Sequence, residues 1–167
     1  MKYTLLLTLL FSTNVLAADL CEPHPELEFF NSMSGILAIE LTEETEAMKN
    51  LPGNSVAKPG SKIISVTLNA ELYNEGKDLF RPLTSSELNS IAFESKRIVI
   101  GSESGESKEH SAKNGKHFTV QELIKAVELT EFKTRGNTDW FGGIDVHHIF
   151  FEGLSCHEGV WMPFWGS

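Results

Sequence analysis

Apolar and polar residues alternate most clearly between positions 62 and 72. There, Ile64, Val66 and Leu68 alternate with Ser65, Thr67 and Asn69. A period of two places the three apolar side chains on one face of an extended chain, so the pattern predicts a half-buried strand. Shorter apolar runs predict two further strands, at 36–41 and 96–100.

Capping motifs predict where two helices begin. The sequences TSSE from Thr84 and TVQE from Thr119 each place a threonine three residues before a glutamate. Both side chains can accept hydrogen bonds from free N–H groups at a helix start. We therefore expect a short helix over 85–91 and a longer one from Val120 onward.

The longer helix carries an apolar stripe, formed by Val120, Leu123, Ile124 and Val127. Residues three and four apart share a helix face, whereas Leu129 and Phe132 lie off this stripe. The helix is therefore expected to end or bend near these two residues.

The remaining segments are short helices and a polar stretch. Pro23 and Pro25 keep the entry extended, and short helices are predicted at 26–33 and 42–50. Residues 101–116 are mostly serine, glycine, glutamate and lysine, a composition typical of a solvated loop.

Two apolar runs near the C-terminus predict an antiparallel hairpin, with strands at 144–151 and 160–165. The turn is expected at 154–159, where it would contain Cys156. Pro163 lacks an N–H, which favours an edge position or a bulge for the second strand. Together the elements predict an α+β fold: a single compact domain, mainly antiparallel sheet with two or three short helices and a C-terminal aromatic hairpin.

Residues 1–17 have the layout of a secretory signal peptide. One lysine precedes an apolar run, and Val15 and Ala17 are short residues at −3 and −1 of a cut after Ala17. The stretch from 4 to 16 has 13 residues, fewer than the roughly 20 that a membrane-spanning helix needs. We expect cleavage after Ala17, which leaves residues 18–167 as one exported globular domain.

A lipid anchor at Cys21 is the alternative way to hold the chain at a membrane. Leu20 precedes this cysteine directly and Asp19 precedes Leu20, which does not resemble the small-residue lipobox of bacterial lipoproteins. With no later apolar run of membrane length, we expect a periplasmic or secreted protein without a membrane span.

The two cysteines, Cys21 and Cys156, lie 135 positions apart. In an oxidising compartment an even pair is most simply a disulfide, and two cysteines allow one connectivity. A catalytic thiol paired with His157 is the alternative, but neighbours on an extended chain point to opposite faces. We therefore expect a disulfide that ties the two ends of the mature chain together.

The charge distribution favours a basic partner. The chain carries a formal charge of −9, which argues against binding to nucleic acid because phosphate backbones would be repelled. Between positions 19 and 52 there are eight acidic residues and one lysine. Glu40, Glu43 and Glu44 belong to this segment and are candidate contacts for a basic protein.

Asp145, His147 and His148 are the weak candidates for catalysis. On a strand, Asp145 and His147 would share a face, a spacing that suits a carboxylate that orients an imidazole, or two metal ligands. Structural pairing is the simpler interpretation, and His148 would be a hydrogen-bonded core residue. A catalytic zinc needs a third protein ligand, for which the sequence offers only scattered histidines: His24, His110, His117 and His157. We assign no metal site and no cofactor.

Aromatic residues of the C-terminal region are candidate binding residues. Trp140, Phe141 and Trp161 could form a recognition surface, since tryptophan is favoured at binding hot spots. The alternative is that these rings fill the core, where each buries a large area.

Three classes of function remain. The first is an exported protein-binding or inhibitory protein, similar in general profile to an immunity protein, that acts through an acidic surface. The second is a small exported hydrolase that uses the Asp/His residues with or without a divalent metal. The third is a structural envelope module. The chain lacks GxSxG, HExxH, P-loop and CxxC motifs, so a binding protein fits better than an enzyme.

Overall fold

Seven strands form one sheet, in the order β3-β2-β1-β8-β9-β5-β6. The computed structural model describes residues 21–42, 57, 60–137 and 143–167. In sheet order the strands are β3 (Leu79–Pro82), β2 (Ile63–Asn74), β1 (Ser34–Leu41), β8 (Phe150–His157), β9 (Val160–Gly166), β5 (Arg97–Gly101) and β6 (Ser107–Ser111). The neighbouring pairs are antiparallel except β5 and β9, which are parallel.

Helices and a two-stranded sheet complete the described fold. They are α1 (Leu27–Asn31), α3 (Ser85–Leu88), α4 (Val120–Thr134), the 3-10 turn η1 (Arg135–Asn137), and the paired strands β4 (Ile91–Phe93) and β7 (Phe118–Thr119). The predicted α+β class, a single compact domain with a mainly antiparallel sheet, is confirmed. No helix in these ranges is long and apolar enough to span a membrane.

Most predicted elements are present. The strands expected at 36–41, 62–72 and 96–100 correspond to β1, β2 and β5, and the helices expected at 26–33 and 85–91 correspond to the shorter α1 and α3. The helix predicted at 42–50 falls, after Thr42, outside the described residues. In β2, Val66 and Leu68 are buried as expected, whereas Ile64 is 51% exposed.

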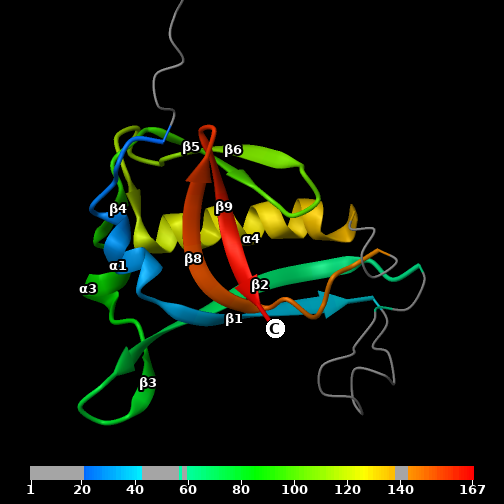
Figure 1. Ribbon diagram of the computed structural model, residues 1–167, viewed down its shortest axis with the longest axis horizontal. Helices are drawn as coiled ribbons and strands as arrows, with labels where there is room; N and C mark the ends of the chain where they lie inside the picture. The colour runs from blue at the N-terminus through cyan, green and yellow to red at the C-terminus, as the bar shows by residue number, and fades with distance from the viewer. Residues whose placement is uncertain (1–20, 43–56, 58–59, 138–142) are drawn as a thin grey trace, which may run out of the picture.

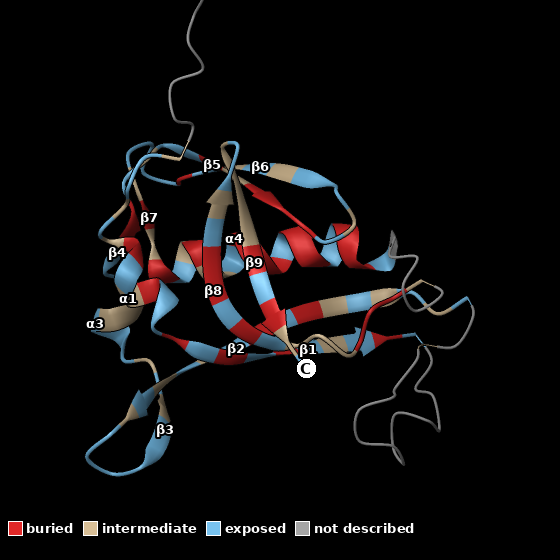
Figure 2. Cartoon of the chain, viewed as in Figure 1, coloured by how far each residue is buried: buried red, intermediate tan, exposed pale blue. Residues whose placement is uncertain are grey.

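The sheet curves around α4. Figure 1 shows β1 and β2 below this helix, β8 and β9 crossing in front of it, and β5 and β6 above it. The inward positions of α4 and the sheet form the core, and the largest side chains there with almost no exposure are Phe30, Phe118, Leu37, Ile100, Leu123, Val120 and Val127. Figure 2 shows buried residues along α4 and along the strands that surround it.

Both predicted capping boxes are present. Thr84 and Glu87 cap α3, and Thr119 and Glu122 cap α4, in each case with both reciprocal hydrogen bonds. The second helix was expected to end or bend near Leu129 and Phe132, and α4 ends at Thr134, two residues after Phe132. These two residues face solvent, with exposed fractions of 38% and 45%.

Polar residues form the buried side of the last turns of α4. Thr130, Glu131 and Thr134 extend the buried stripe of the helix, and each is hydrogen-bonded. The hydroxyls of Thr130 and Thr134 donate to backbone carbonyls four residues earlier, at 3.0 and 2.9 Å. A buried polar group is tolerated when it is satisfied in this way.

The loop expected over 101–116 contains an edge strand. β6 pairs in full with β5, from Arg97 opposite Ser111 to Gly101 opposite Ser107. Pairing of strands uses backbone groups, so an edge strand with polar side chains forms without an apolar pattern. The composition of residues 101–116 therefore does not predict this strand.

The C-terminal hairpin is shorter at its start than expected. The strand predicted at 144–151 is wrong, since β8 begins only at Phe150. The turn predicted at 154–159 is also too long, because β8 and β9 pair up to His157 opposite Val160. Glu158 and Gly159 both adopt positive φ, the geometry of a two-residue hairpin turn.

Cys156 and Pro163 are consequently placed differently from the prediction. Cys156 lies within β8 and not in a turn. β9 lies between β8 and β5 and is not an edge strand. The strand tolerates Pro163 because its pairing with β5 is confined to Trp161 opposite Ile100. The bulge lies across from it, between Phe151 and Gly153 of β8.

Candidate functional site

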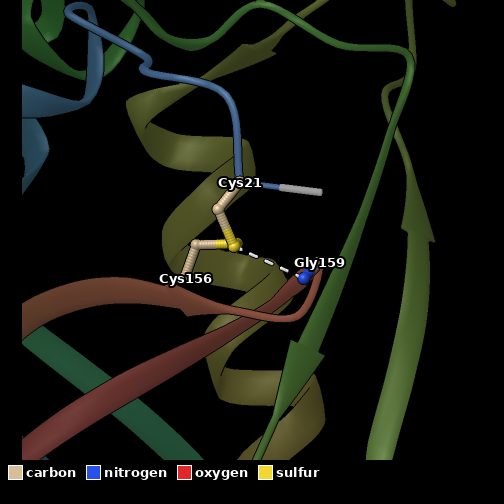
Figure 3. The surroundings of a disulfide bond; sticks show 3 residues. All are labelled: Cys21, Cys156 and Gly159. Carbon is tan, nitrogen blue, oxygen red and sulfur yellow. Dashed lines mark hydrogen bonds between the residues drawn. A yellow bond between two sulfur atoms is a disulfide. The ribbon is translucent and has the colours of Figure 1, made fainter. Parts of the chain in front are cut away.

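The predicted disulfide is present. Cys21 and Cys156 are bonded, and the Gly159 N–H donates to the Cys21 sulfur at 3.4 Å. Figure 3 shows the bond joining the N-terminal segment to the tip of the β8–β9 hairpin. The side chain of Asn31 adds a second tie, because its amide exchanges two hydrogen bonds with the backbone of Leu154, at 2.8 and 3.0 Å. The first described residues and the C-terminal hairpin are thus fixed together.

Asp145 organises the segment that precedes β8. Its Oδ1 accepts hydrogen bonds from the backbone N–H groups of His147 and His148, at 2.8 and 3.2 Å. A short carboxylate that bonds its own backbone two and three residues later stabilises a turn and competes with strand pairing. This is the physical reason why the strand predicted from Ile144 does not form.

The carboxylate of Asp145 pairs with the side chain of His148, whereas its bond to His147 is to the backbone N–H. The Oδ2 of Asp145 lies 3.0 Å from Nδ1 of His148. The two histidine rings stack edge to face at 5.0 Å. The shared strand face that suggested an Asp145–His147 pair is absent because the segment is not extended.

Arg135, at the end of α4, joins this segment to the core. Its Nε donates to Oε2 of Glu131 at 2.6 Å, and its Nη1 donates to the backbone carbonyls of Asp145 and His148 at 3.0 and 2.8 Å. The indole of Trp165 donates to the other oxygen of Glu131 at 3.2 Å. The guanidinium also lies 5.1 Å from the centre of the Trp165 ring, within the range of a cation–π contact.

The two buried carboxyl groups differ in their proton affinity. Burial raises the pKa of Glu131, and the charge and hydrogen bond of Arg135 offset that effect only in part. Burial also acts to raise the pKa of Asp145, but the hydrogen bonds from His147 and His148 and the charge of Arg135 outweigh it, so that pKa is lowered. Asp145 is therefore an ionised acceptor at neutral pH.

Glu103 completes a group with metal-ligand chemistry. Glu103, Asp145 and His148 each place one possible ligand atom within 4.8 Å of the other two. The cavity beside them has a volume of about 10 Å³, room for a single water. However, Nη1 of Arg135 lies 3.7 Å from Oδ2 of Asp145 and supplies a positive charge there. The arrangement fits an internal ion-pair network better than a divalent cation site.

The other histidines considered as ligands have partners elsewhere. His24 bonds Glu26 at 2.8 Å and stacks on Phe93, and His110 bonds Thr130 at 2.8 Å. The backbone N–H of His117 donates to Asn114, and His157 lies exposed at the end of β8. The structure thus brings Asp145 and His148 together and leaves these four histidines out.

The aromatic candidates lie in different places. Trp161 packs on the inner side of the hairpin, with its ring 5.2 Å from that of Phe93 and 5.6 Å from that of His24. Core packing accounts for this ring. Trp140 and Phe141 lie outside the described residues, as do Glu43 and Glu44. Glu40 is exposed on β1, where its carboxylate accepts a hydrogen bond from Ser65.

A second feature, which sequence reasoning missed, is the side of the sheet that faces away from α4. We use the term outer face for six exposed residues of β1, β8 and β9 on that side: Ile36, Ala38, Glu40, Phe150, Glu152 and Phe164. Ile36 and Phe150 are register partners on neighbouring strands. Ile36, Phe150 and Phe164 are 47%, 46% and 52% exposed, although their chain neighbours Leu37, Phe151 and Trp165 are buried.

Glycine brings the outer-face side chains close together. Gly166 of β9 lies opposite Phe150, and a Cβ at Gly166 would lie 3.7 Å from the Cβ of Phe150 and 2.5 Å from an Oε1 of Glu152. Phe150 and Glu152 therefore lie over the end of β9, beside Phe164. The signal in the sequence is the presence of large apolar residues at consecutive positions of the hairpin strands, such as Phe150 with Phe151 and Phe164 with Trp165.

Comparison with known proteins adds no further assignment. No protein-family model matches the chain, and no curated protein or solved structure is significantly similar to it.

Proposed function

We propose that this protein is an exported, soluble binding protein of the immunity type, which inhibits a basic protein by holding it against the outer face. The observation that carries the proposal is the cluster of Ile36, Phe150 and Phe164, three large apolar side chains each about half exposed on adjoining strands. Contiguous exposed apolar groups framed by polar residues are typical of protein interaction sites.

Rigidity supports this use of the outer face. The three residues project from paired strands, so their positions are set by backbone hydrogen bonds and little ordering is needed on binding. The disulfide at the hairpin tip and the bonds of Asn31 to Leu154 hold the same strands from the other end. A preformed apolar centre is what a stable interface requires.

Charge favours a basic partner. The outer face contains the carboxylates of Glu40 and Glu152 and no lysine or arginine, and the β2 residues paired with its β1 part, Ser65, Thr67 and Asn69, are uncharged. Acidic groups around an apolar centre attract a basic partner and suppress acidic ones. Glu43 and Glu44, which follow β1 in the sequence, and Trp140 and Phe141 remain predicted contacts.

Export is part of the proposal. The disulfide supports an oxidising compartment, because such bonds persist outside the cytosol. The N-terminal apolar segment supports secretion with cleavage after Ala17. Sequencing of the N-terminus of the protein recovered from the periplasm or medium tests this, with residue 18 as the expected first residue and an intact leader as the contradicting result.

The binding proposal is tested by capture with matched variants. Immobilised protein is exposed to an extract of potential targets at low and high salt, alongside Phe164→Glu and Phe132→Glu. Phe132 of α4 is a suitable control because it is equally large, 45% exposed and distant in the fold from the outer face. We expect a partner of high isoelectric point that is retained by the native protein and by Phe132→Glu and is lost with Phe164→Glu.

Two results would overturn the proposal. One is a partner that Phe164→Glu retains as well as the native protein does. The other is a native protein that forms a dimer which Ile36→Glu separates into monomers, because the outer face would then be occupied by a second copy. Inhibition is measured on the purified partner, whose activity must fall as the protein is added.

A second candidate is the small exported hydrolase. The observation in its favour is the 3.0 Å contact of Asp145 with His148, since a carboxylate can orient an imidazole for proton transfer. Metal analysis of the purified protein, with His148→Ala and His147→Ala as a pair, tests the metal-dependent form. Stoichiometric metal that is lost only with His148→Ala would favour this function, and absence of metal would remove that form.

A further inference from the structure

A cavity of about 700 Å³ lies on the opposite side of the molecule's sheet from the outer face, between α4 and β2. Pro82 at the end of β3, the adjacent Leu83 and Leu88 of α3 line one end of it, and the end of β6 with the turn after it lines the other. Its volume is within the range of about 300–1,000 Å³ that small-molecule sites have. The cavity is separate from the Asp145 cluster, with which it shares no lining residue.

The walls of this cavity are largely apolar. Leu68 and Ala70 of β2 face Ile124 and Leu129 of α4 across it, and Phe118 contributes to its inner wall. Leu129, which lies off the apolar stripe of α4 and is 38% exposed, also lines the cavity. An apolar chain against these walls would lose part of its contact with water, which is favourable.

Three of the polar side chains in the walls already have partners within the protein: Glu128, Glu122 and His110. Glu128 accepts the backbone N–H of Leu68 at 3.0 Å and pairs with Lys125 at 2.9 Å. Glu122 is turned to the N–H of Thr119 as part of the capping box. His110 bonds Thr130, and burial, with a smaller contribution from Lys108, lowers its pKa to about 4, so the ring is uncharged at neutral pH.

Lys113 differs from these groups. It lies at the cavity, in the turn after β6, and has no ion pair with any carboxylate in the part of the chain that the structure describes. Glu122 is the other charged group of the lining without an ion pair in that part of the chain, and its carboxylate lies at the N-terminus of α4, where the helix dipole offsets its charge. An apolar cavity with the Lys113 ammonium at its edge is then complementary to an apolar molecule that carries a single negative charge. A fatty acid has both properties.

We propose that the cavity between α4 and β2 binds a medium-chain carboxylic acid, with the acyl chain against Leu68, Ile124 and Leu129 and the carboxylate at Lys113. The site is independent of the partner proposed for the outer face. Occupancy of this cavity would add apolar contacts between α4 and β2 and would favour the folded state by mass action.

Titration calorimetry with sodium decanoate, decanol and decylamine tests the proposal, each at a concentration below that at which decanoate forms micelles. We expect saturable binding in the order decanoate, decanol, decylamine. The exposed ion pair at Lys113 should make decanoate about two- to fivefold tighter than decanol. Octanoate should bind more weakly than decanoate by about fourfold for each missing methylene.

Matched variants locate the site. Lys113→Ala should abolish the preference for decanoate over decanol, whereas Lys116→Ala, an exposed lysine of the same loop that does not line the cavity, should preserve it. Leu129→Glu should weaken decanoate binding, and Phe132→Glu, one turn further along α4, should not. The proposal would be overturned if binding were not saturable, or if the native protein bound decanoate and decanol equally well. It would also be overturned if Lys113→Ala and Lys116→Ala, or Leu129→Glu and Phe132→Glu, had equal effects.

Discussion

Arg135 and Glu131 form an ion pair that is almost completely buried: Nε and Oε2 are 2.6 Å apart, and the two side chains are 3% and 4% exposed. Glu131 and Arg135 lie one helical turn apart at the end of α4, and both contact Trp165 of β9. Through the carbonyls of Asp145 and His148, Arg135 also holds the segment that leads into β8. Arg135 thus connects the end of α4 to the segment that leads into β8.

Loss of Arg135 should be strongly destabilising. Arg135→Met removes the charge while it keeps much of the side-chain volume, and it leaves Glu131 buried without a counter-charge. Breaking one half of a buried ion pair typically costs about 3–5 kcal/mol. Urea unfolding followed by tryptophan fluorescence measures the change, and a cost below about 1 kcal/mol would contradict the role assigned to this pair.

The double variant Glu131→Gln/Arg135→Met is the matched control. Glutamine at position 131 is uncharged, so it needs no counter-charge, and its amide oxygen can still accept the hydrogen bond of the Trp165 indole. Part of the stability lost with Arg135→Met should therefore return. The two substitutions should therefore be non-additive, with an interaction energy of about 1–3 kcal/mol. Simple additivity would show that the two groups do not act as a pair.

His110 should make the protein less stable as the pH falls. Burial lowers its pKa to about 4 in the folded protein, whereas the unfolded chain takes up the proton near pH 6.5. Between these values the unfolded state binds more protons, so the stability present above pH 6.5 is lost on the way down to about pH 4. Because the ring is only half-buried, we expect this loss to be about 1–2 kcal/mol.

The comparison of His110→Gln with the native protein isolates this effect. Urea midpoints at pH 7 and pH 5 should differ less in the variant, because its residue 110 has no titrating ring. His157→Gln, a change at an exposed position at the end of β8, should leave the native pH dependence intact. An unchanged pH dependence in His110→Gln would be inconsistent with a buried neutral imidazole.

Asp145 should act as a turn-forming residue whose oxygen matters more than its charge. Asp145→Asn keeps an oxygen that can accept the N–H groups of His147 and His148, whereas Asp145→Ala leaves both donors in a partly buried segment without that acceptor. Each lost buried hydrogen bond costs about 1–3 kcal/mol, so the alanine variant should be clearly the less stable of the two. Thermal unfolding measures both, and equal stability would argue against the turn.

Reduction of the disulfide should lower stability substantially. The bond between Cys21 and Cys156 closes a loop over a sequence separation of 135, for which the chain-entropy account gives about 4–5 kcal/mol. Urea unfolding of the protein and of Cys21→Ser/Cys156→Ser, each with and without reductant, measures the difference. The serine variant should not respond to reductant, and a native protein that behaves like it would contradict the contribution of the bond.

Local sequence signals predicted part of this fold well. The capping boxes at Thr84 and Thr119 work through side chains within four residues of the helix start, so the sequence alone predicts them. The alternation in β2 is an equally direct signal for a strand, and the cysteine pair for a disulfide. By contrast, β6 is an edge strand whose polar side chains contain no burial pattern, and only its backbone pairing with Arg97–Gly101 defines it.

The candidate site was harder to predict because its contacts join distant parts of the chain. Glu131 and Arg135 are four residues apart, and in the sequence such a pair is the same as one on a solvated helix surface. The available hint was that Thr130, Glu131 and Thr134 continue the stripe of Val120, Leu123 and Val127. On the outer face, the exposure of Phe150 and Phe164 depends on which side of the sheet α4 covers. A local sequence pattern does not predict that side.

The affinity of the captured partner for Ile36→Glu, compared with Phe132→Glu, tests the account most directly. Ile36 belongs to the outer face, opposite Phe150, and a carboxylate there would replace an apolar contact of the interface with a group that loses its water on binding. The account predicts that the dissociation constant rises at least tenfold for Ile36→Glu and stays within about twofold of the native value for Phe132→Glu. Equal affinity of the two variants would contradict binding through the outer face.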